Sequence, residues 1–236
     1  IANVYFFNGD YQNSIKNADL GINYATKANN SIWIINNNVE KVQSLISLNQ
    51  LDKAEQTLVP ILILAKKETD KTFEANIYSI YALLKLKKKD YQSATNLYKK
   101  AFLSYKKLVT PFGLGDKYGC SQALINLGVT YTAKDEYSNA LKYYNEALEY
   151  ANDPSTKSLI FDNIGEVYKK KQDFPNALKY LTKSLLTAPI NYTDSSIIKN
   201  PTKISLKLSP SKTYLLSTIK DKADTWLDFY KYDKNK

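Results

Sequence analysis

The sequence of 236 residues predicts an all-α fold, a right-handed superhelical solenoid of antiparallel helix pairs. Three observations lead to this prediction. A short turn motif recurs five times, the apolar residues between the turns follow the period of an amphipathic helix, and glycine and proline are scarce, with seven residues of each. Together these features are typical of helical hairpins that stack on one another.

The recurring motif is a turn in which a small residue follows an aromatic residue or leucine at the third position. The five copies are Asp10–Ser14, Gln50–Ala54, Asp90–Ala94, Glu136–Ala140 and Asp173–Ala177. Their small residues lie 40, 40, 46 and 37 positions apart, so each interval has room for two helices. One hairpin cannot bury its apolar stripe alone, and five hairpins exceed the about three that such a fold requires.

The hairpins are expected to fill residues 1–190. Over 191–209 the helical period disappears and Lys203–Leu208 alternates polar and apolar residues, which indicates an extended or hairpin segment. The period returns in 210–236, which we interpret as the first helix of a sixth repeat. Its predicted apolar face holds Leu215, Leu216, Ile219, Ala223, Trp226, Leu227 and Tyr230. Because the sequence has no second helix for this repeat, we expect it to belong to a larger protein.

Two copies carry the full repeat pattern. The first has Leu127, Gly128, Tyr131, Tyr137, Ala140, Tyr144 and Ala147, and the second has Ile164, Gly165, Tyr168, Phe174, Ala177, Leu181, Ser184 and Pro189. This pattern resembles the tetratricopeptide repeat (TPR). The insert at 111–115 makes the repeats resemble the long variety, of about 40–42 residues, found in kinesin light chains and in bacterial scaffold and sensor proteins. The resemblance implies a scaffold that binds a protein or peptide.

A second resemblance covers the end of the chain. The break at Asn200-Pro201 and the pattern of Leu216–Trp226 resemble the repeat region of Bacteroidetes-type proteins that continue into a caspase-like CHAT peptidase domain. This resemblance implies that the repeats regulate, or bring substrate to, a C-terminal domain beyond Lys236. A sensor kinase is the alternative parent, and in either case the catalytic residues lie outside this sequence.

The composition excludes most catalytic and metal sites within the chain. Histidine is absent, which excludes Ser-His-Asp and Cys-His catalysis and histidine-bound zinc. Cys120 is the single cysteine and forms neither an internal disulfide nor a multi-cysteine zinc site. We therefore expect no enzyme activity and no cofactor or metal. The longest apolar run, Val59–Ala65, is far shorter than the about 20 residues of a membrane span. The cytoplasm is favoured, and export after removal of a signal peptide stays open.

In TPR proteins the first helix of each hairpin lines the concave surface. By this resemblance the partner-binding residues are Gln122, Asn126, Val129, Thr132, Asp162, Asn163, Glu166 and Lys169. Asn126 and Asn163 occupy the same repeat position, and an amide suits a peptide bond because it both donates and accepts hydrogen bonds. The alternative is that these asparagines bond within the solenoid. The lysine and asparagine set that holds a free C-terminal carboxylate in chaperone-binding members is not reproduced.

The net charge of +10 is concentrated in lysines, and the chain has no arginine. The lysine-rich segment 85–107 indicates either a solvated helix face or a surface for nucleic acid or an acidic protein. We favour a solvated helix face, because proteins that recognise bases and phosphates usually use the forked guanidinium group of arginine.

Overall fold

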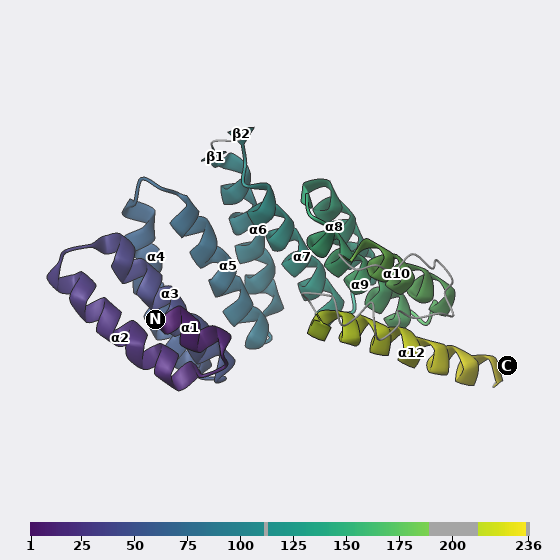
Figure 1. Ribbon diagram of the computed structural model, residues 1–236. Coiled ribbons are helices and arrows are strands. Elements are labelled where there is room, and N and C mark those ends of the chain that lie inside the picture. The colour runs from purple at the N-terminus through teal and green to yellow at the C-terminus, as the bar shows by residue number, and fades with distance from the viewer. Residues whose placement is uncertain (111–112, 189–211, 235–236) are drawn as a thin grey trace. The chain divides into compact units, whose positions relative to one another are not determined.

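The structure, a computed structural model, describes residues 1–110, 113–188 and 212–234 (Figure 1). It divides into two compact units, Ile1–Asn126 and Leu127–Lys236. The segment 191–209, predicted to be extended, lies outside the described residues.

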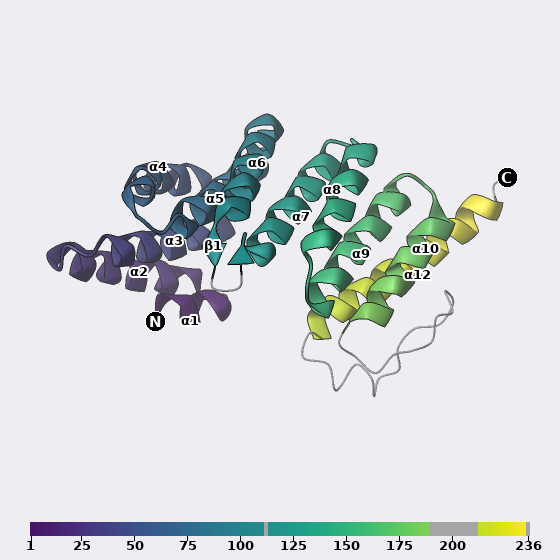
Figure 2. The same cartoon turned by 90° about the horizontal axis from the view of Figure 1, so that it is seen from above.

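Both units consist of helices that pack against their neighbours in sequence (Figures 1 and 2). The first unit holds α1 (Ala2–Phe7), α2 (Tyr11–Lys27), α3 (Ser31–Ser47), α4 (Leu51–Lys67), α5 (Thr72–Lys87), α6 (Tyr91–Lys107) and the first part of α7 (Lys117–Ala133). The second holds the end of α7, α8 (Tyr137–Tyr150), α9 (Pro154–Lys170), α10 (Phe174–Thr187) and α12 (Lys212–Lys234). The predicted all-α architecture of consecutive helix pairs is confirmed.

Each predicted turn joins the two helices of a hairpin. The second helices begin at Tyr11, Leu51, Tyr91, Tyr137 and Phe174, one residue into the motif. At three of these turns an aspartate caps the second helix by accepting a hydrogen bond from the backbone N–H three residues on. The residue before each cap has a positive φ, between +58° and +77°; these residues are Gly9, Asn49, Lys89, Asp135 and Gln172. The repeated left-handed residue reverses the chain direction between the helices.

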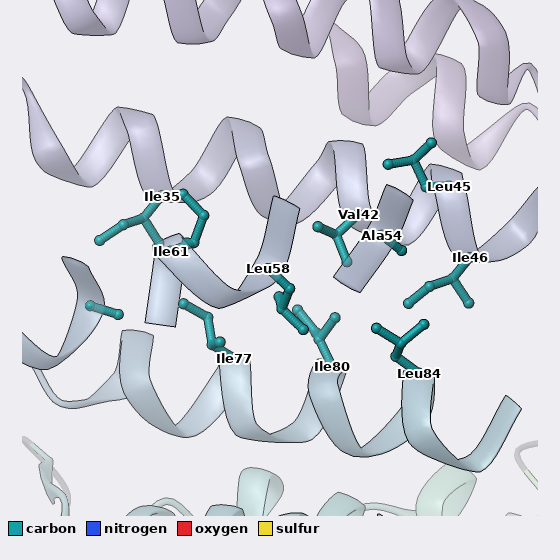
Figure 3. Packing of buried hydrophobic residues seen from close by; sticks show 11 residues of the cluster. Ile35, Val42, Leu45, Ile46, Ala54, Leu58, Ile61, Ile77, Ile80 and Leu84 are labelled. Atoms are coloured by element: carbon teal, nitrogen blue, oxygen red, sulfur yellow. The ribbon is translucent and has the colours of Figure 1, made fainter. Parts of the chain in front are cut away.

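The motif's small residues lie where helices approach most closely. Ser14, Ala54, Ala94, Ala140 and Ala177 are all fully buried. In the first unit, a cluster of apolar side chains from α3, α4 and α5 surrounds Ala54 (Figure 3). Ser14 fits the same kind of space because its hydroxyl accepts a hydrogen bond from Ser44 Oγ at 2.9 Å.

Glycines in α7 and α9 allow equally close contacts in the second unit. A Cβ atom on Gly128 would lie 2.4 Å from Cε1 of Tyr144, and one on Gly165 would lie 2.8 Å from Cγ of Leu181. These glycines therefore let the two helices of a hairpin approach closely.

The insert between α6 and α7 contains two short strands that the sequence did not predict. β1 (Val109–Thr110) pairs antiparallel with β2 (Gly113–Leu114). Gly115 follows at φ +86°, and its N–H donates a 2.5 Å hydrogen bond to the carbonyl of Leu108. A pair this short leaves no alternating pattern long enough to recognise in a sequence.

The helix α12 packs against α10 and, less extensively, α9. Among the side chains of this helix that the structure describes, those of Thr218, Lys222 and Thr225 are fully buried, and none of the three belongs to the predicted apolar face. Leu216 and Tyr230, from that predicted face, are more than half exposed. Within the described residues the predicted apolar face is thus only partly covered: Ile219 and Trp226 are half-buried, whereas Ala223 and Leu227 are exposed.

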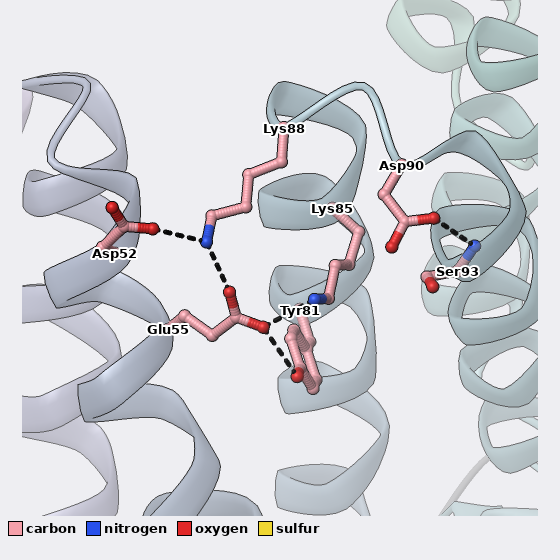
Figure 4. A network of polar contacts seen from close by, with 7 residues as sticks. All are labelled: Asp52, Glu55, Tyr81, Lys85, Lys88, Asp90 and Ser93. Carbon is pink, nitrogen blue, oxygen red and sulfur yellow. Dashed lines mark hydrogen bonds and ion pairs between the residues drawn. The ribbon is translucent and has the colours of Figure 1, made fainter.

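An ionic network ties α4 to α5 (Figure 4). The carboxylate of Glu55 accepts hydrogen bonds from Lys85 and Lys88, both at 2.6 Å, and from the hydroxyl of Tyr81 at 3.0 Å. Lys88 also donates to Asp52 at 2.7 Å. Hydrogen bonds from Lys85 and then from Lys88 lower the pKa of Glu55 from its ordinary 4.5 to about 2.

This network makes the stability of the first unit depend on pH. Because the pKa of Glu55 is lower in the folded state, its contribution is complete above about pH 4.5 and is lost as the pH falls toward 2. We expect Glu55→Gln to cost about 1 kcal/mol at pH 7, since the network is partly exposed, and nothing near pH 2. Thermal melts of both proteins across this range test the prediction. A difference that stays constant with pH would contradict it.

Candidate protein-interaction site

A cavity of about 360 Å³ opens on the first unit between the first helices of successive hairpins. Three helices line it: α3 with residues 35–43, α5 with residues 73–80 and the start of α7. Tyr105 of α6 also lines it, and the side chains of Val39 and Phe73 form an apolar part of its wall. Concave sites with apolar walls and a few placed polar groups are typical of ligand sites. We call this cavity the groove.

An amide side chain from each of the three helices lies in the groove. Asn36 is on α3, Asn76 on α5 and Gln122 on α7. Their spacings of 40 and 46 residues equal those between Ala54, Ala94 and Ala140, so the three amides occupy one position of the repeat. We call these three residues the amide row. Gln43 and Asn126 add two further amides to the lining.

The groove holds its amides in different ways. The hydroxyl of Tyr105 donates a 2.5 Å hydrogen bond to Oδ1 of Asn76, which orients this amide and leaves its Nδ2 available as a donor. Tyr105 is itself fixed by burial, which raises the pKa of its hydroxyl. Within the described residues, the side chains of Asn36 and Gln122 make no hydrogen bond. These two amides therefore keep their full capacity for a ligand.

The charge of the groove is small and negative. Asp116 is the one charged residue among the described residues of its lining. One of its carboxylate oxygens accepts a 3.0 Å hydrogen bond from the N–H of Gly119 at the start of α7. A lining without lysine does not favour a free carboxylate, whereas neutral amides suit the alternating N–H and C=O groups of a peptide backbone.

Of the residues predicted from the sequence, Gln122 and Asn126 line the groove. Val129 and Thr132 lie farther along α7, in the second unit. The hydroxyl of Thr132 donates to the carbonyl of Gly128 at 2.9 Å and lies 3.4 Å from the hydroxyl of Tyr144, so it is bonded within its own hairpin. All of the predicted site residues are half-buried.

The other predicted residues lie on α9. Glu166 and Lys169 line a separate cavity of about 440 Å³ together with residues of α10 and α12. Lys169 Nζ is 3.9 Å from a carboxylate oxygen of Asp228 on α12. Asp162 lies deeper, where burial raises the pKa of its carboxyl to about 6 against the opposing hydrogen bond of Thr218. Asn163, next to it, is half-buried.

Sequence reasoning missed the contributions of α3 and α5. The predicted residues belong to the two copies with the full repeat pattern, which include Gly128 and Gly165. Because α3 and α5 lack such a glycine, Asn36 and Asn76 were not predicted. The spacing of the small motif residues held the missing signal. Moving Gln122 back by 46 and then by 40 residues gives Asn76 and Asn36.

The lysine-rich segment is partly neutralised. Lys85 and Lys88 are paired with Glu55 and Asp52 in the network between α4 and α5. Lys100 lies with its Nζ 5.9 Å from the centre of the Tyr78 ring. Lysines paired with carboxylates contribute less to a field that attracts nucleic acid, which for Lys85 and Lys88 supports the solvated interpretation over the nucleic-acid alternative.

Other kinds of site find little support in the part of the chain that the structure describes. It brings together no group of three or more histidine, cysteine, aspartate or glutamate residues that could hold a metal ion. Cys120 is buried, and this burial raises the pKa of its thiol to about 11. None of the described helices combines the length and the apolar character that crossing a bilayer requires.

Comparison with known proteins agrees with the repeat pattern. Residues 121–154 match the family model of the tetratricopeptide repeat. No curated protein sequence matches the chain. Among solved structures, BtubC (BKLC) from P. vanneervenii is similar with a TM-score of 0.66 and 16% identity, over 95% of this chain and 87% of that chain.

Two further structures share the fold over different extents. PilF from Pseudomonas aeruginosa matches with a TM-score of 0.59 and 13% identity, over 100% of this chain and 94% of that chain. A STAND protein with a tetratricopeptide repeat sensor, PH0952 from Pyrococcus horikoshii, matches with a TM-score of 0.67 and 18% identity, over 79% of this chain and 28% of that chain. Residues 121–154 therefore carry a tetratricopeptide repeat, and the chain shares its fold with these solved structures, one of which contains a tetratricopeptide repeat sensor.

Proposed function

We propose that this protein is a non-catalytic scaffold that binds an extended polypeptide segment of a partner in the groove of its first unit. The amide row carries the proposal. Three amides from three consecutive first helices line one cavity, and two of them have no hydrogen bond within the described residues. A row of groups that donate and accept at regular intervals matches the regular N–H and C=O groups of an extended backbone.

The apolar wall of the groove supplies affinity beside the polar contacts. Val39 and Phe73 are half-buried there, so an apolar ligand side chain that packs against them loses its contact with water. Amides alone exchange hydrogen bonds to water for hydrogen bonds to the ligand, and each contributes only about 0.5–1.5 kcal/mol. The wall therefore supplies much of the affinity, and the amides fix the path of the backbone.

The experiment is a selection of random displayed peptides on the purified chain, followed by binding measurements on the enriched sequences. We expect the combined replacement of Asn36, Asn76 and Gln122 by alanine to weaken the binding of these peptides by about tenfold or more, because each substitution removes hydrogen bonds to the peptide. Enrichment of no sequence, or undiminished binding to the substituted protein, contradicts the proposal.

A matched control replaces three exposed amides on second helices. Gln12, Gln56 and Asn96 lie on α2, α4 and α6 outside the groove, and their replacement by alanine removes the same number of amides. This control is expected to bind every enriched peptide normally. Equal losses in both triple variants would show that the amides act through solubility or folding rather than through the groove.

The role as regulatory arm of a CHAT-like peptidase or of a sensor kinase stays a prediction. It is compatible with the scaffold proposal, because the bound segment is then part of an adjoining domain or of that domain's substrate. The full-length gene product decides it by showing, or not showing, a peptidase or kinase domain.

A further inference from the structure

Within the described residues, the groove has its one charged side chain at the end where α7 begins. Asp116 directly precedes α7, and Tyr118 lies on the first turn of this helix with 66% of its surface exposed. Both residues line the groove. A carboxylate and the face of an aromatic ring each attract a lysine or arginine side chain. We call Asp116 and Tyr118 the acidic end of the groove.

Hydrogen bonds to the backbone hold Asp116 in place. Its N–H donates to the carbonyl of Tyr105 at 2.9 Å, and its carbonyl accepts from the N–H of Cys120 at 2.8 Å. Oδ1 of its carboxylate accepts from the N–H of Gly119 at 3.0 Å. The other oxygen, Oδ2, makes no hydrogen bond with the described residues and is not fully buried. One oxygen therefore fixes the carboxylate, and the other keeps its lone pairs for a ligand.

Capping of α7 explains the place of Asp116 but not its charge. The same repeat position holds Asn30, Asp70 and Asp153, at the spacings of 40, 46 and 37 residues that also separate the small residues of the motif. Each of the three accepts a backbone hydrogen bond at the start of its own first helix. Because the neutral amide of Asn30 does this as a carboxylate does, the cap does not require a charge. Of the four residues, only Asp116 lines the groove.

The carboxylate of Asp116 forms no ion pair with a lysine in the part of the chain that the structure describes. Asp116 and Lys107 both line a neighbouring cavity of about 630 Å³, yet no ion pair joins them. The groove is thus locally negative in a chain whose net charge is +10. A single carboxylate in such surroundings favours a cationic ligand side chain and disfavours an acidic one.

The amide row brings a ligand side chain within reach of the acidic end. Gln122 lies four residues after Tyr118, so the two share one face of α7. Asp116 lies six residues before Gln122, about 9 Å along the helix axis at about 1.5 Å per residue. Lysine and arginine carry their charge at the end of a long apolar stem. A segment whose backbone is bound by Gln122 can therefore place such a side chain along Tyr118 and against Asp116.

The start of α5 lies beside the start of α7, because Thr72 and Asp116 line one cavity. Phe73, on the first turn of α5, belongs to the apolar wall of the groove. Side chains on one face of an extended segment recur every second residue, about 6.6 Å apart, and neighbouring helix axes lie about 8–10 Å apart. The ligand side chains that contact Phe73 and Asp116 are therefore about two or four residues apart.

We propose that the segment bound in the groove carries a lysine or arginine that pairs with Asp116 and lies against Tyr118, and an apolar residue about two or four positions away that contacts Phe73. This inference rests on the function proposed above and adds the chemistry of the partner, a segment that is both basic and apolar. The ion pair acts mainly in selection, because a partly exposed pair adds little affinity, whereas an acidic residue at the same place is repelled.

The test repeats the peptide selection in parallel on the wild-type chain and on two variants. Asp116→Asn keeps a capping side chain of the same shape without its charge, and Asp116→Lys reverses the charge. The wild-type chain should enrich peptides with lysine or arginine about two or four positions from an apolar residue. Asp116→Asn should abolish this preference, and Asp116→Lys should enrich aspartate or glutamate instead.

A double-mutant cycle on one enriched peptide measures the ion pair. Asp116→Asn and replacement of the peptide's basic residue by glutamine should each weaken binding by about two- to fivefold, and both together by no more than either alone. Asp70→Asn is the matched control, since it removes a carboxylate at the same repeat position outside the groove and should bind normally. Fluorescence anisotropy gives the dissociation constants, and circular dichroism shows that each variant keeps its helices.

Two results would overturn this inference and leave the proposed function in place. One is enrichment of peptides without a basic residue at this spacing, and the other is a pair of losses in the cycle that multiply as independent effects. An equal loss in Asp70→Asn would overturn it as well, by assigning the effect to the net charge of the chain. Enrichment of no peptide by the wild-type chain would contradict the proposed function itself, and this inference with it.

Discussion

Replacing Leu58 by alanine is expected to lower the free energy of unfolding of the first unit by about 2–5 kcal/mol. Leu58 is fully buried on α4, which packs against both α3 and α5 (Figure 3). Its removal leaves a cavity between three helices whose apolar stripes depend on one another. Because stacked repeats are stabilised mainly by their neighbours, the loss extends beyond one hairpin.

The control for this substitution lies on the same helix. Ile63 is 58% exposed, so Ile63→Ala should change stability by no more than about 0.5 kcal/mol. Urea denaturation followed by circular dichroism measures both variants. Similar losses in the two proteins would mean that the interface between α3, α4 and α5 is not the stabilising core.

Replacing Gly128 by valine should destabilise the second unit by about 1–3 kcal/mol through overpacking. The first atom of the new side chain would lie 2.4 Å from the Tyr144 ring, and that ring is itself buried between the helices. The hairpin must open or the ring must leave its rotamer.

A double-mutant cycle identifies the cause. In a Tyr144→Leu background, which imitates the pairing of Gly165 with Leu181, Gly128→Val should cost less than it does in the wild type. Denaturant midpoints of the four proteins give the coupling energy. An unchanged cost would show that Tyr144 is not the residue with which the valine collides.

The hairpins were predictable because their signals are local. The turn acids Asp10, Asp90 and Asp173 cap the helices that they precede, and each small motif residue is buried as its type requires. Both features act within a few residues of sequence. Because the same turn motif recurs in each copy, every copy supports the assignment of the others.

The features that escaped prediction depend on contacts between repeats. The period of α12 shows an apolar stripe but not the side from which α10 approaches, so the burial of Lys222 could not be foreseen. Glu55 meets Lys85 and Lys88 across 30 or more residues, and no local pattern pairs them. The lysines of segment 85–107 therefore do not form one uniform basic face, because Lys85 and Lys88 pair with carboxylates of α4.

The candidate site was predictable in part for the same reason. Gln122 and Asn126 lie in a copy that carries the full repeat pattern, and both line the groove. Asn36 and Asn76 follow only when repeats with weaker patterns are aligned by their small residues. Residues that act together in a solenoid are thus distant in sequence and equivalent in repeat position.

The spacing of the amide row also determines how many residues of a bound polypeptide segment correspond to each helix. Neighbouring helix axes are about 8–10 Å apart, and an extended chain advances about 3.3 Å per residue. One helix of the groove therefore corresponds to about three residues of ligand, whereas side chains of an extended strand alternate every two. A segment bound through its backbone by Asn36, Asn76 and Gln122 would therefore meet one amide about every third residue, with side chains of alternating faces next to successive helices.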